Sequence, residues 1–164
     1  MLDVPMSASS YALITHWRLA LPIQPVWEEL MHPERWPQWW RGVRAVQLLE
    51  HGDAAGVGAY RHMTWRSALP YELTFNMRTT VIEPMSRIEG VADGELDGRG
   101  VWTLAPQGAV TRVRYDWRVA ATKPWMRVLA PIARPLFAWN HGVVMGWGER
   151  GLRQRLSATV ARTA

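Results

Sequence analysis

Two side chains in this sequence of 164 residues have the type and the setting to do chemistry in a buried site, Asn140 and His62. Asn140 is the one polar residue in an apolar helical stripe, where its amide could donate to and accept from a ligand carbonyl or hydroxyl. His62 lies in the middle of a predicted strand, where an imidazole could move protons near neutral pH. Both are candidate catalytic residues. The alternatives are that the Asn140 amide is hydrogen-bonded within the protein and that His62 points outward.

The orientation of His62 depends on a strand register that the sequence leaves open. Within residues 57–67, either the side carrying His62 or the side carrying Met63 and Trp65 faces inward. His141 follows Asn140 directly, but on a helical wheel it falls on the face opposite the apolar stripe, so we expect it to point outward.

Several classes of chemistry are excluded by what the sequence lacks. There is no Cys, which removes disulfides, thiol nucleophiles and Cys-ligated metals. The five His show no metal-binding spacing, and there is no phosphate-binding glycine loop and no Gly-x-Ser-x-Gly motif. We therefore expect no metal, no cofactor and no serine nucleophile.

The elements that must position these residues are mostly strands. Breaks at Pro and Gly separate about seven strand-length segments, and alternation is clearest in 71–83 and 111–119, where one side is apolar and the other charged. Two short helices, 25–31 and 33–40, follow the first strand. The only long amphipathic segment is 125–147, in which Pro131 and Pro135 predict a break or kink.

The motifs around the two short helices resemble the START/Bet v 1-like (SRPBCC) superfamily, and within it the bacterial polyketide cyclase/dehydrase and lipid-transport group. The resemblance rests on Ile23-Gln-Pro-Val-Trp-Glu-Glu-Leu, then His32-Pro-Glu-Arg-Trp-Pro-Gln-Trp-Trp, with Gly108-Ala-Val-Thr-Arg-Val as support. It implies an α+β helix-grip fold, in which a curved seven-stranded antiparallel sheet wraps around a long C-terminal helix. It further implies an apolar cavity between the two layers.

The length favours one domain over residues 9–157, with flexible segments at 1–8 and 158–164. Inward strand positions and the stripe of the long helix then give the candidate ligand-binding residues. They are Trp17, Tyr71, Phe75, Trp102, Tyr115, Trp117, Leu136, Trp139, Asn140, Val143 and Trp147. Each aromatic ring taken alone could simply pack in the core. Taken together, these rings favour a concave apolar site.

The charge is unevenly divided along the chain. Residues 1–111 carry a net charge of −3, whereas residues 112–164 carry +8. A segment that combines Arg127 and Arg134 with Trp125 and Trp139 is suited to an anionic membrane surface, and a merely solvated basic face is the alternative. No nucleic-acid motif is present, and we expect no nucleic-acid partner.

The resulting expectation is a cytoplasmic protein, because neither a signal peptide nor a long apolar span is visible. It binds a hydrophobic small molecule, such as a lipid, a polyketide or an isoprenoid, as a carrier. One alternative is a polyketide cyclase or dehydratase that uses the same cavity with Asn140 and His62. The other is a lipid-binding protein that works at the membrane surface through its basic C-terminal third. The oligomeric state stays open.

Overall fold

A seven-stranded antiparallel sheet and one long helix make up most of the computed structural model, which describes residues 10–163. The elements in chain order are β1 (Ser10–Leu19), α1 (Ile23–Met31), η1 (Pro33–Gln38), β2 (Val43–Glu50), β3 (Tyr60–Arg66), β4 (Glu72–Glu83), β5 (Arg87–Gly94), β6 (Leu96–Gln107), β7 (Val110–Ala121) and α2 (Pro124–Thr163). The strand order is β1-β7-β6-β5-β4-β3-β2. This confirms the predicted α+β helix-grip fold, including the two short helices between the first two strands.

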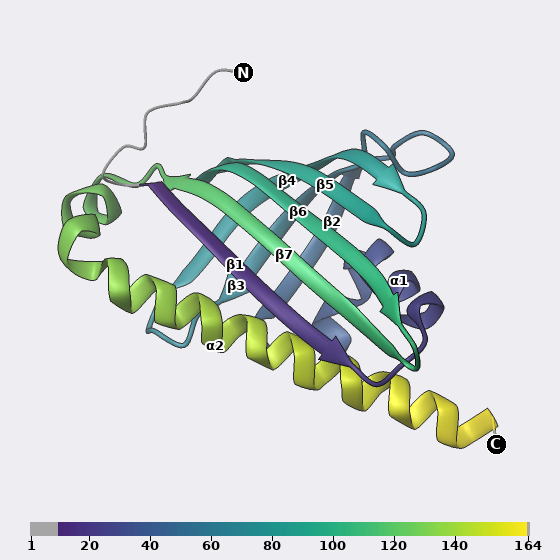
Figure 1. The fold of residues 1–164 in the computed structure, drawn as a ribbon. Helices are drawn as coiled ribbons and strands as arrows, with labels where there is room; N and C mark the ends of the chain where they lie inside the picture. Colours follow the sequence, from purple (N-terminus) through teal and green to yellow (C-terminus); the bar gives the residue numbers. More distant parts are fainter. Residues whose placement is uncertain (1–9, 164) are drawn as a thin grey trace.

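The sheet curves around α2, which crosses its concave side beside β1 (Figure 1). The strands from β2 to β7 follow one another in the sheet, and β1 pairs with β7 at the far edge, with Thr15 opposite Tyr115. Along β7, Val113, Trp117 and Val119 are buried while the intervening arginines are exposed. The alternation predicted from the sequence therefore gives the concave face its apolar side chains.

The densest part of the core lies where α1, η1 and the C-terminal half of α2 meet the sheet. Trp40, Leu19, Leu30, Val26 and Leu152 are almost fully buried there. Burial of a side chain of this size contributes on the order of 2 kcal/mol to folding. This end of the molecule is therefore a packed core that lies next to the cavity.

α2 is assigned as helix from Pro124 to Thr163 without interruption, although Pro131 and Pro135 lie within it. Its N-terminal turns are set at an angle to the rest of the helix (Figure 1), and proline is the usual cause of such a bend. The predicted break is thus a bend in a continuous helix. The helix also continues past residue 157, where the sequence suggested a tail, and the predicted segment 1–8 lies outside the described residues.

Within residues 10–163, no helix is long and apolar enough to cross a membrane.

Candidate functional site

An apolar cavity of about 180 Å³ lies between the sheet and α2. Its wall combines side chains from β1, from β3 to β7, from the η1 region and from α2. The aromatic residues of the wall are Tyr11, Trp36, Trp40, Trp65, Tyr71, Phe75, Trp102, Tyr115, Trp117 and Phe137. A concave space lined by so many rings is the kind of site that takes an apolar small molecule.

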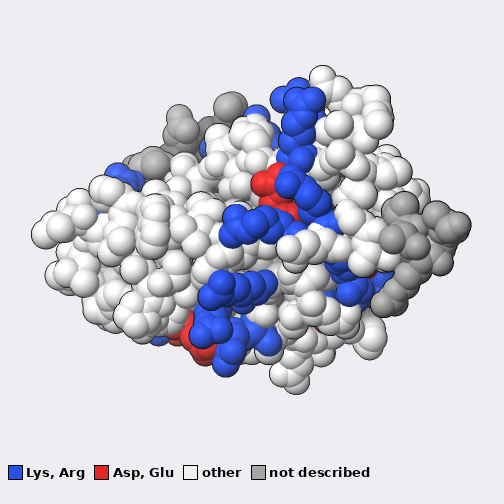
Figure 2. All heavy atoms as spheres, turned by 90° about the horizontal axis from the view of Figure 1, so that it is seen from below, with Lys and Arg blue, Asp and Glu red and all other residues white. Residues whose placement is uncertain are grey.

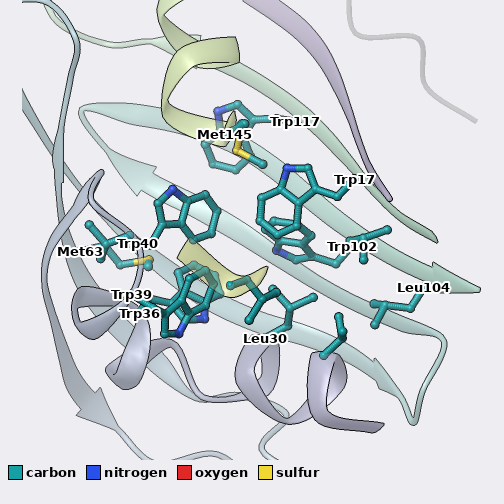
Figure 3. Close-up of a cluster of buried hydrophobic side chains, with 14 of the residues drawn as sticks. Trp17, Leu30, Trp36, Trp39, Trp40, Met63, Trp102, Leu104, Trp117 and Met145 are labelled. Atoms are coloured by element: carbon teal, nitrogen blue, oxygen red, sulfur yellow. The ribbon is translucent and has the colours of Figure 1, made fainter. Parts of the chain in front are cut away.

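A cluster of tryptophans closes the cavity at the end nearest α1. Figure 3 shows Trp17, Trp40 and Trp102 gathered between the sheet and the helices, and the ring centroids of Trp17 and Trp40 are 5.4 Å apart. The Trp40 Nε1 donates to the backbone carbonyl of Val144 over 2.8 Å, which fixes this cluster to α2. Bulky rings wedged between the layers hold sheet and helix apart, and the cavity is the space that remains beside them.

The opposite end of the cavity is closed by a second group of rings. Tyr71, from the loop before β4, packs edge-on against Phe137 and Trp125 of α2, with ring centroids 6.3 and 5.9 Å apart. Tyr11 of β1 packs edge-on against the same Phe137. These contacts are formed by the N-terminal half of α2, so that half of the helix covers the cavity.

Asn140 faces the cavity, as predicted, and is 7% exposed. Its Oδ1 accepts hydrogen bonds from the Ser67 hydroxyl (2.9 Å) and from the backbone N–H of Ala68 (2.8 Å). Because a backbone N–H can only donate, the atom facing Ala68 must be the amide oxygen. Asn140 therefore fastens the loop between β3 and β4 to α2, and its Nδ2 has no acceptor among the described residues.

His141 also lines the cavity, and the prediction that it points outward is wrong. Its Nε2 lies 3.2 Å from the Thr15 hydroxyl of β1. Burial lowers the pKa of this imidazole to about 4, because an apolar environment disfavours its charged form. His141 is consequently neutral at physiological pH.

His62 lies on the other face of the sheet. Its Nδ1 is 2.8 Å from Asn76 Oδ1, and Asn76 in turn donates to Asp93, which also accepts from the Tyr60 hydroxyl. The register that the sequence left open is settled by Met63, which is 2% exposed and lines the cavity. His62 thus belongs to a surface network on the convex side and does not meet Asn140.

Five of the six strand residues predicted for the cavity lie in its wall, and Trp17 does not. Tyr71, Phe75, Trp102, Tyr115 and Trp117 line it, and the buried Trp17 lies next to it in the tryptophan cluster.

Four of the five predicted α2 residues are not in the cavity wall. Leu136 and Trp139 are 46% and 54% exposed, and Val143 and Trp147 are absent from the lining. The cause is the rotation of the helix, because the buried face is centred on other side chains. Those that line the cavity are Met126, Phe137, Asn140, His141, Val144 and Met145.

Among the strand residues of the wall that the predicted set lacks are Tyr11, Met63 and Trp65. The pairing of Met63 with Phe75 and of Trp65 with Leu73 places all four side chains on one face. Alternation in β4 was clear from the sequence, and the pairing with β4 is what determines which side of β3 faces inward. The register of that pairing is a tertiary property, which local sequence patterns do not give.

Of the three charged residues that line the cavity, Arg66 is exposed at the end of β3, and Arg61 and Glu89 are paired. Arg61 donates to Glu34 over 2.7 Å, and Glu89, which is 5% exposed, is bound by Arg87 and Arg99. Residues 10–163 contain no group of His, Asp and Glu that could hold a metal ion. The cavity therefore offers rings, thioethers and a few neutral polar atoms.

The cavity contains hydroxyl and indole groups without partners. The Tyr115 hydroxyl has no hydrogen bond to any described residue, and burial raises its pKa above the usual value. The Tyr11 hydroxyl and the Trp65 Nε1 are buried and also lack partners. Polar groups in a protein interior are normally hydrogen-bonded, so unpaired ones at a cavity are a sign of a ligand site.

A family model described as polyketide cyclase / dehydrase and lipid transport matches residues 19–145. No curated protein matches the chain. Among solved structures, the Zhui aromatase/cyclase from Streptomyces sp. R1128 is similar with a TM-score of 0.75 and 16% identity, over 92% of this chain and 96% of that one. A START superfamily protein from Mycobacterium smegmatis has a TM-score of 0.74 and 12% identity, over 90% and 98%. The protein TTHA0849 from Thermus thermophilus has a TM-score of 0.72 and 16% identity, over 90% and 99%.

Proposed function

The chain belongs to the polyketide cyclase / dehydrase and lipid transport family of the SRPBCC superfamily, and from this premise we propose that it binds a hydrophobic small molecule as a carrier. The family supports hydrophobic ligand binding or cyclase activity in general. The observation that carries the proposal is the apolar cavity between the sheet and α2, with its wall of aromatic side chains.

The cavity volume limits the ligand. An apolar protein cavity of roughly 150 Å³ accommodates benzene, so a space of about 180 Å³ is suited to a molecule of one or two rings. We therefore propose a compact, ring-containing ligand.

Carrier function is favoured over cyclase function by the state of the titratable groups. An effective general base has a pKa near the working pH, and the pKa of His141 is held at about 4. His62 is on the convex face, and both hydrogen bonds of the Asn140 oxygen are made to the protein itself. The neutral His141 offers a ligand a hydrogen bond and little basicity.

Native mass spectrometry of the purified protein tests this function directly, since a carrier should retain a ligand that denaturation releases. Calorimetry with naphthalene provides the second measurement. Leu73→Trp, which adds volume inside the wall, should reduce naphthalene affinity at least tenfold. Leu49→Trp is the matched control, because Leu49 is 48% exposed on β2. Equal naphthalene binding by both variants would contradict the proposal.

A second function, binding at an anionic membrane surface, is favoured by the outer face of α2. Val128, Ile132 and Trp139 are 76%, 85% and 54% exposed. Exposed apolar side chains that gather on one helix in this way are typical of an interaction surface. Together with Trp125, Leu129 and Leu136 they form what we call the outer apolar face.

The charges around the outer apolar face favour a lipid surface as its partner. Residues 117–148 contain no Asp or Glu. Arg127 and Arg134 are exposed on the same helix, and Arg134 donates to the backbone carbonyl of Ser10. Figure 2, which views the α2 side, shows a broad area nearly free of charge next to a band of Lys and Arg side chains. In binding at a membrane surface, apolar and Trp side chains insert into the lipid layer, and Arg side chains lie at the level of the lipid phosphates.

Co-sedimentation with vesicles tests the membrane role. We expect binding to vesicles containing phosphatidylglycerol and little binding to pure phosphatidylcholine. Arg127→Glu with Arg134→Glu should weaken it more than about tenfold, since each basic residue near the surface contributes on the order of 1 kcal/mol. Arg112→Glu with Arg118→Glu is the control, because it changes the net charge equally on the exposed outer side of β7.

Equal binding to both vesicle types, or equal loss in the two double variants, would contradict this role. Concentration-dependent dimers in sedimentation velocity that Ile132→Ser abolishes would assign the outer apolar face to a second copy of the chain instead.

A further inference from the structure

We infer that the ligand carries an acceptor oxygen, such as a carbonyl or an ether, and that the Tyr115 hydroxyl donates a hydrogen bond to it. This rests on the proposed binding function and narrows its ligand class to neutral, ring-containing molecules with an oxygen acceptor. Tyr115 thereby becomes a residue that determines specificity in the cavity.

The ring of Tyr115 is held in one position. It stacks on Trp102 with ring centroids 4.1 Å apart and lies nearly parallel to Trp117, with a centroid distance of 5.7 Å. A ring fixed between two others loses little further freedom when a ligand binds. Its hydroxyl is therefore a preorganised group on the cavity wall.

The space around the Tyr115 hydroxyl depends on Gly100 of β6. A Cβ added at Gly100 would lie 2.5 Å from the hydroxyl oxygen, so any other residue there would cover or displace it. Gly100 itself lines the cavity. The hydroxyl has no hydrogen bond to any residue in 10–163, and Tyr115 is half-buried on the cavity wall, so its hydroxyl is free to donate to a ligand oxygen.

The other unpaired polar groups of the cavity are also of the donor type. The Trp65 Nε1 and the Asn140 Nδ2 can only donate, and a tyrosine hydroxyl such as that of Tyr11 can donate as well. Among the described residues, each buried side-chain nitrogen or oxygen without a partner carries a hydrogen. A cavity with surplus donors is complementary to acceptors, and it disfavours a ligand that brings further donors.

Both unpaired tyrosines stay protonated at physiological pH, because burial raises the pKa of Tyr11 and of Tyr115. On the wall, Arg61 and the buried Glu89 are neutralised by partners from the protein, and the exposed Arg66 lies on β3, which is separated from β7 by three strands. An ionised ligand would find no free counter-charge next to Tyr115. The acceptor oxygen we infer therefore belongs to a neutral molecule.

The test uses two probes with the same carbon skeleton, 1-tetralone with one carbonyl and tetralin with none. Calorimetric affinities are compared for the wild type, Tyr115→Phe and Tyr60→Phe. Tyr115→Phe should weaken 1-tetralone about 2- to 10-fold and leave tetralin unchanged, which is the effect of one neutral hydrogen bond. Tyr60→Phe removes a hydroxyl bound to Asp93 on the convex face and should change neither affinity.

The stability of the empty protein adds a readout that a purely structural role would not give. Removing a hydroxyl that has no protein partner should leave the stability of Tyr115→Phe unchanged or raise it, whereas Tyr60→Phe, which removes a hydroxyl bound to Asp93, should lower it slightly. Ligand affinity and stability thus move in different directions for Tyr115.

Equal weakening of both probes by Tyr115→Phe, or of neither, would overturn this inference while leaving the binding function intact. Failure of both probes to bind the wild type would instead contradict the proposed binding function itself. Tyr11→Phe, measured in the same way, tells whether the acceptor lies at the Tyr71 end of the cavity.

Discussion

The two halves of α2 differ in almost every physical respect although they belong to one helix. In the C-terminal half, Leu152 and Leu156 are 0% and 6% exposed, and a Cβ at Gly148 or Gly151 would overlap the tryptophan segment that follows η1. In the N-terminal half, the larger apolar side chains are mostly outside, with Ile132 at 85% exposure. One half is packed as a core helix and the other covers a cavity.

The difference shows how one helix can serve both stability and binding. Close approach at the glycines lets the Trp39 and Trp40 region contact the helix backbone directly, and the hydrogen bond from Trp40 to Val144 fixes the distance between them. The N-terminal half makes its inward contacts through separate side chains, such as the ring of Phe137 and the hydrogen-bonded amide of Asn140. A segment that covers a cavity through separate side-chain contacts is suited to opening for entry and exit of a ligand.

The largest expected effect comes from removing one tryptophan at each half of α2: Trp40, which packs against the C-terminal half, and Trp139, which belongs to the N-terminal half. Trp40→Ala should destabilise the protein by about 3–5 kcal/mol, because it deletes a side chain with 0% exposure and leaves a cavity. Trp139→Ala, at a position 54% exposed, should stay within about 0.5 kcal/mol. Urea unfolding followed by circular dichroism measures both. Comparable losses would mean that the two halves of α2 contribute equally to stability.

The same comparison explains what the sequence could and could not predict. Strands β4 and β7 were predicted from alternation because one side is charged and the other apolar, and the whole sheet follows from such patterns and turns. In α2 the N-terminal half is apolar on nearly all sides, so hydrophobicity does not define which face turns inward. A wheel centred on Leu136 consequently put His141 outside and Trp139 inside, and both placements are reversed.

For the candidate site, Asn140 and the strand aromatics were predictable, whereas the orientation of β3 was not. The side of β3 that faces inward depends on its pairing with β4, where Met63 meets Phe75. The space around the Tyr115 hydroxyl depends on Gly100, a residue of the neighbouring strand β6. Such contacts between distant positions leave no local pattern in one sequence.

A smaller effect is expected from acid at the junction of the two halves. The pKa of His141 is about 4 in the folded protein and near 6.5 in an unfolded chain. Between these values the unfolded state binds the proton more readily, so stability should fall as the pH drops from about 6.5 to 4, by up to about 3 kcal/mol. Urea unfolding across this range should show a shallower pH dependence for His141→Gln.

The control for this pH effect is His16→Gln, since His16 is an exposed residue on the outer side of β1. It should retain the steeper pH dependence of the wild type. An unchanged slope in His141→Gln would mean that His141 is protonated as easily in the folded protein as in the unfolded chain.

The smallest expected effect compares two glycines of α2 that differ only in their surroundings. A Cβ at Gly148 would lie 2.7 Å from Trp40 Cζ2, and that indole is fully buried, so Gly148→Ala should cost about 1–2 kcal/mol through overpacking. At Gly142 no atom lies within 4 Å of an added Cβ, so Gly142→Ala should gain up to about 1 kcal/mol from helix propensity alone. Opposite signs in thermal unfolding would show that close approach, and not helix flexibility, is the reason for a glycine at 148. A gain at both positions would mean that the tryptophan cluster yields to the helix, and the C-terminal half of α2 would then be as loosely held as the N-terminal half.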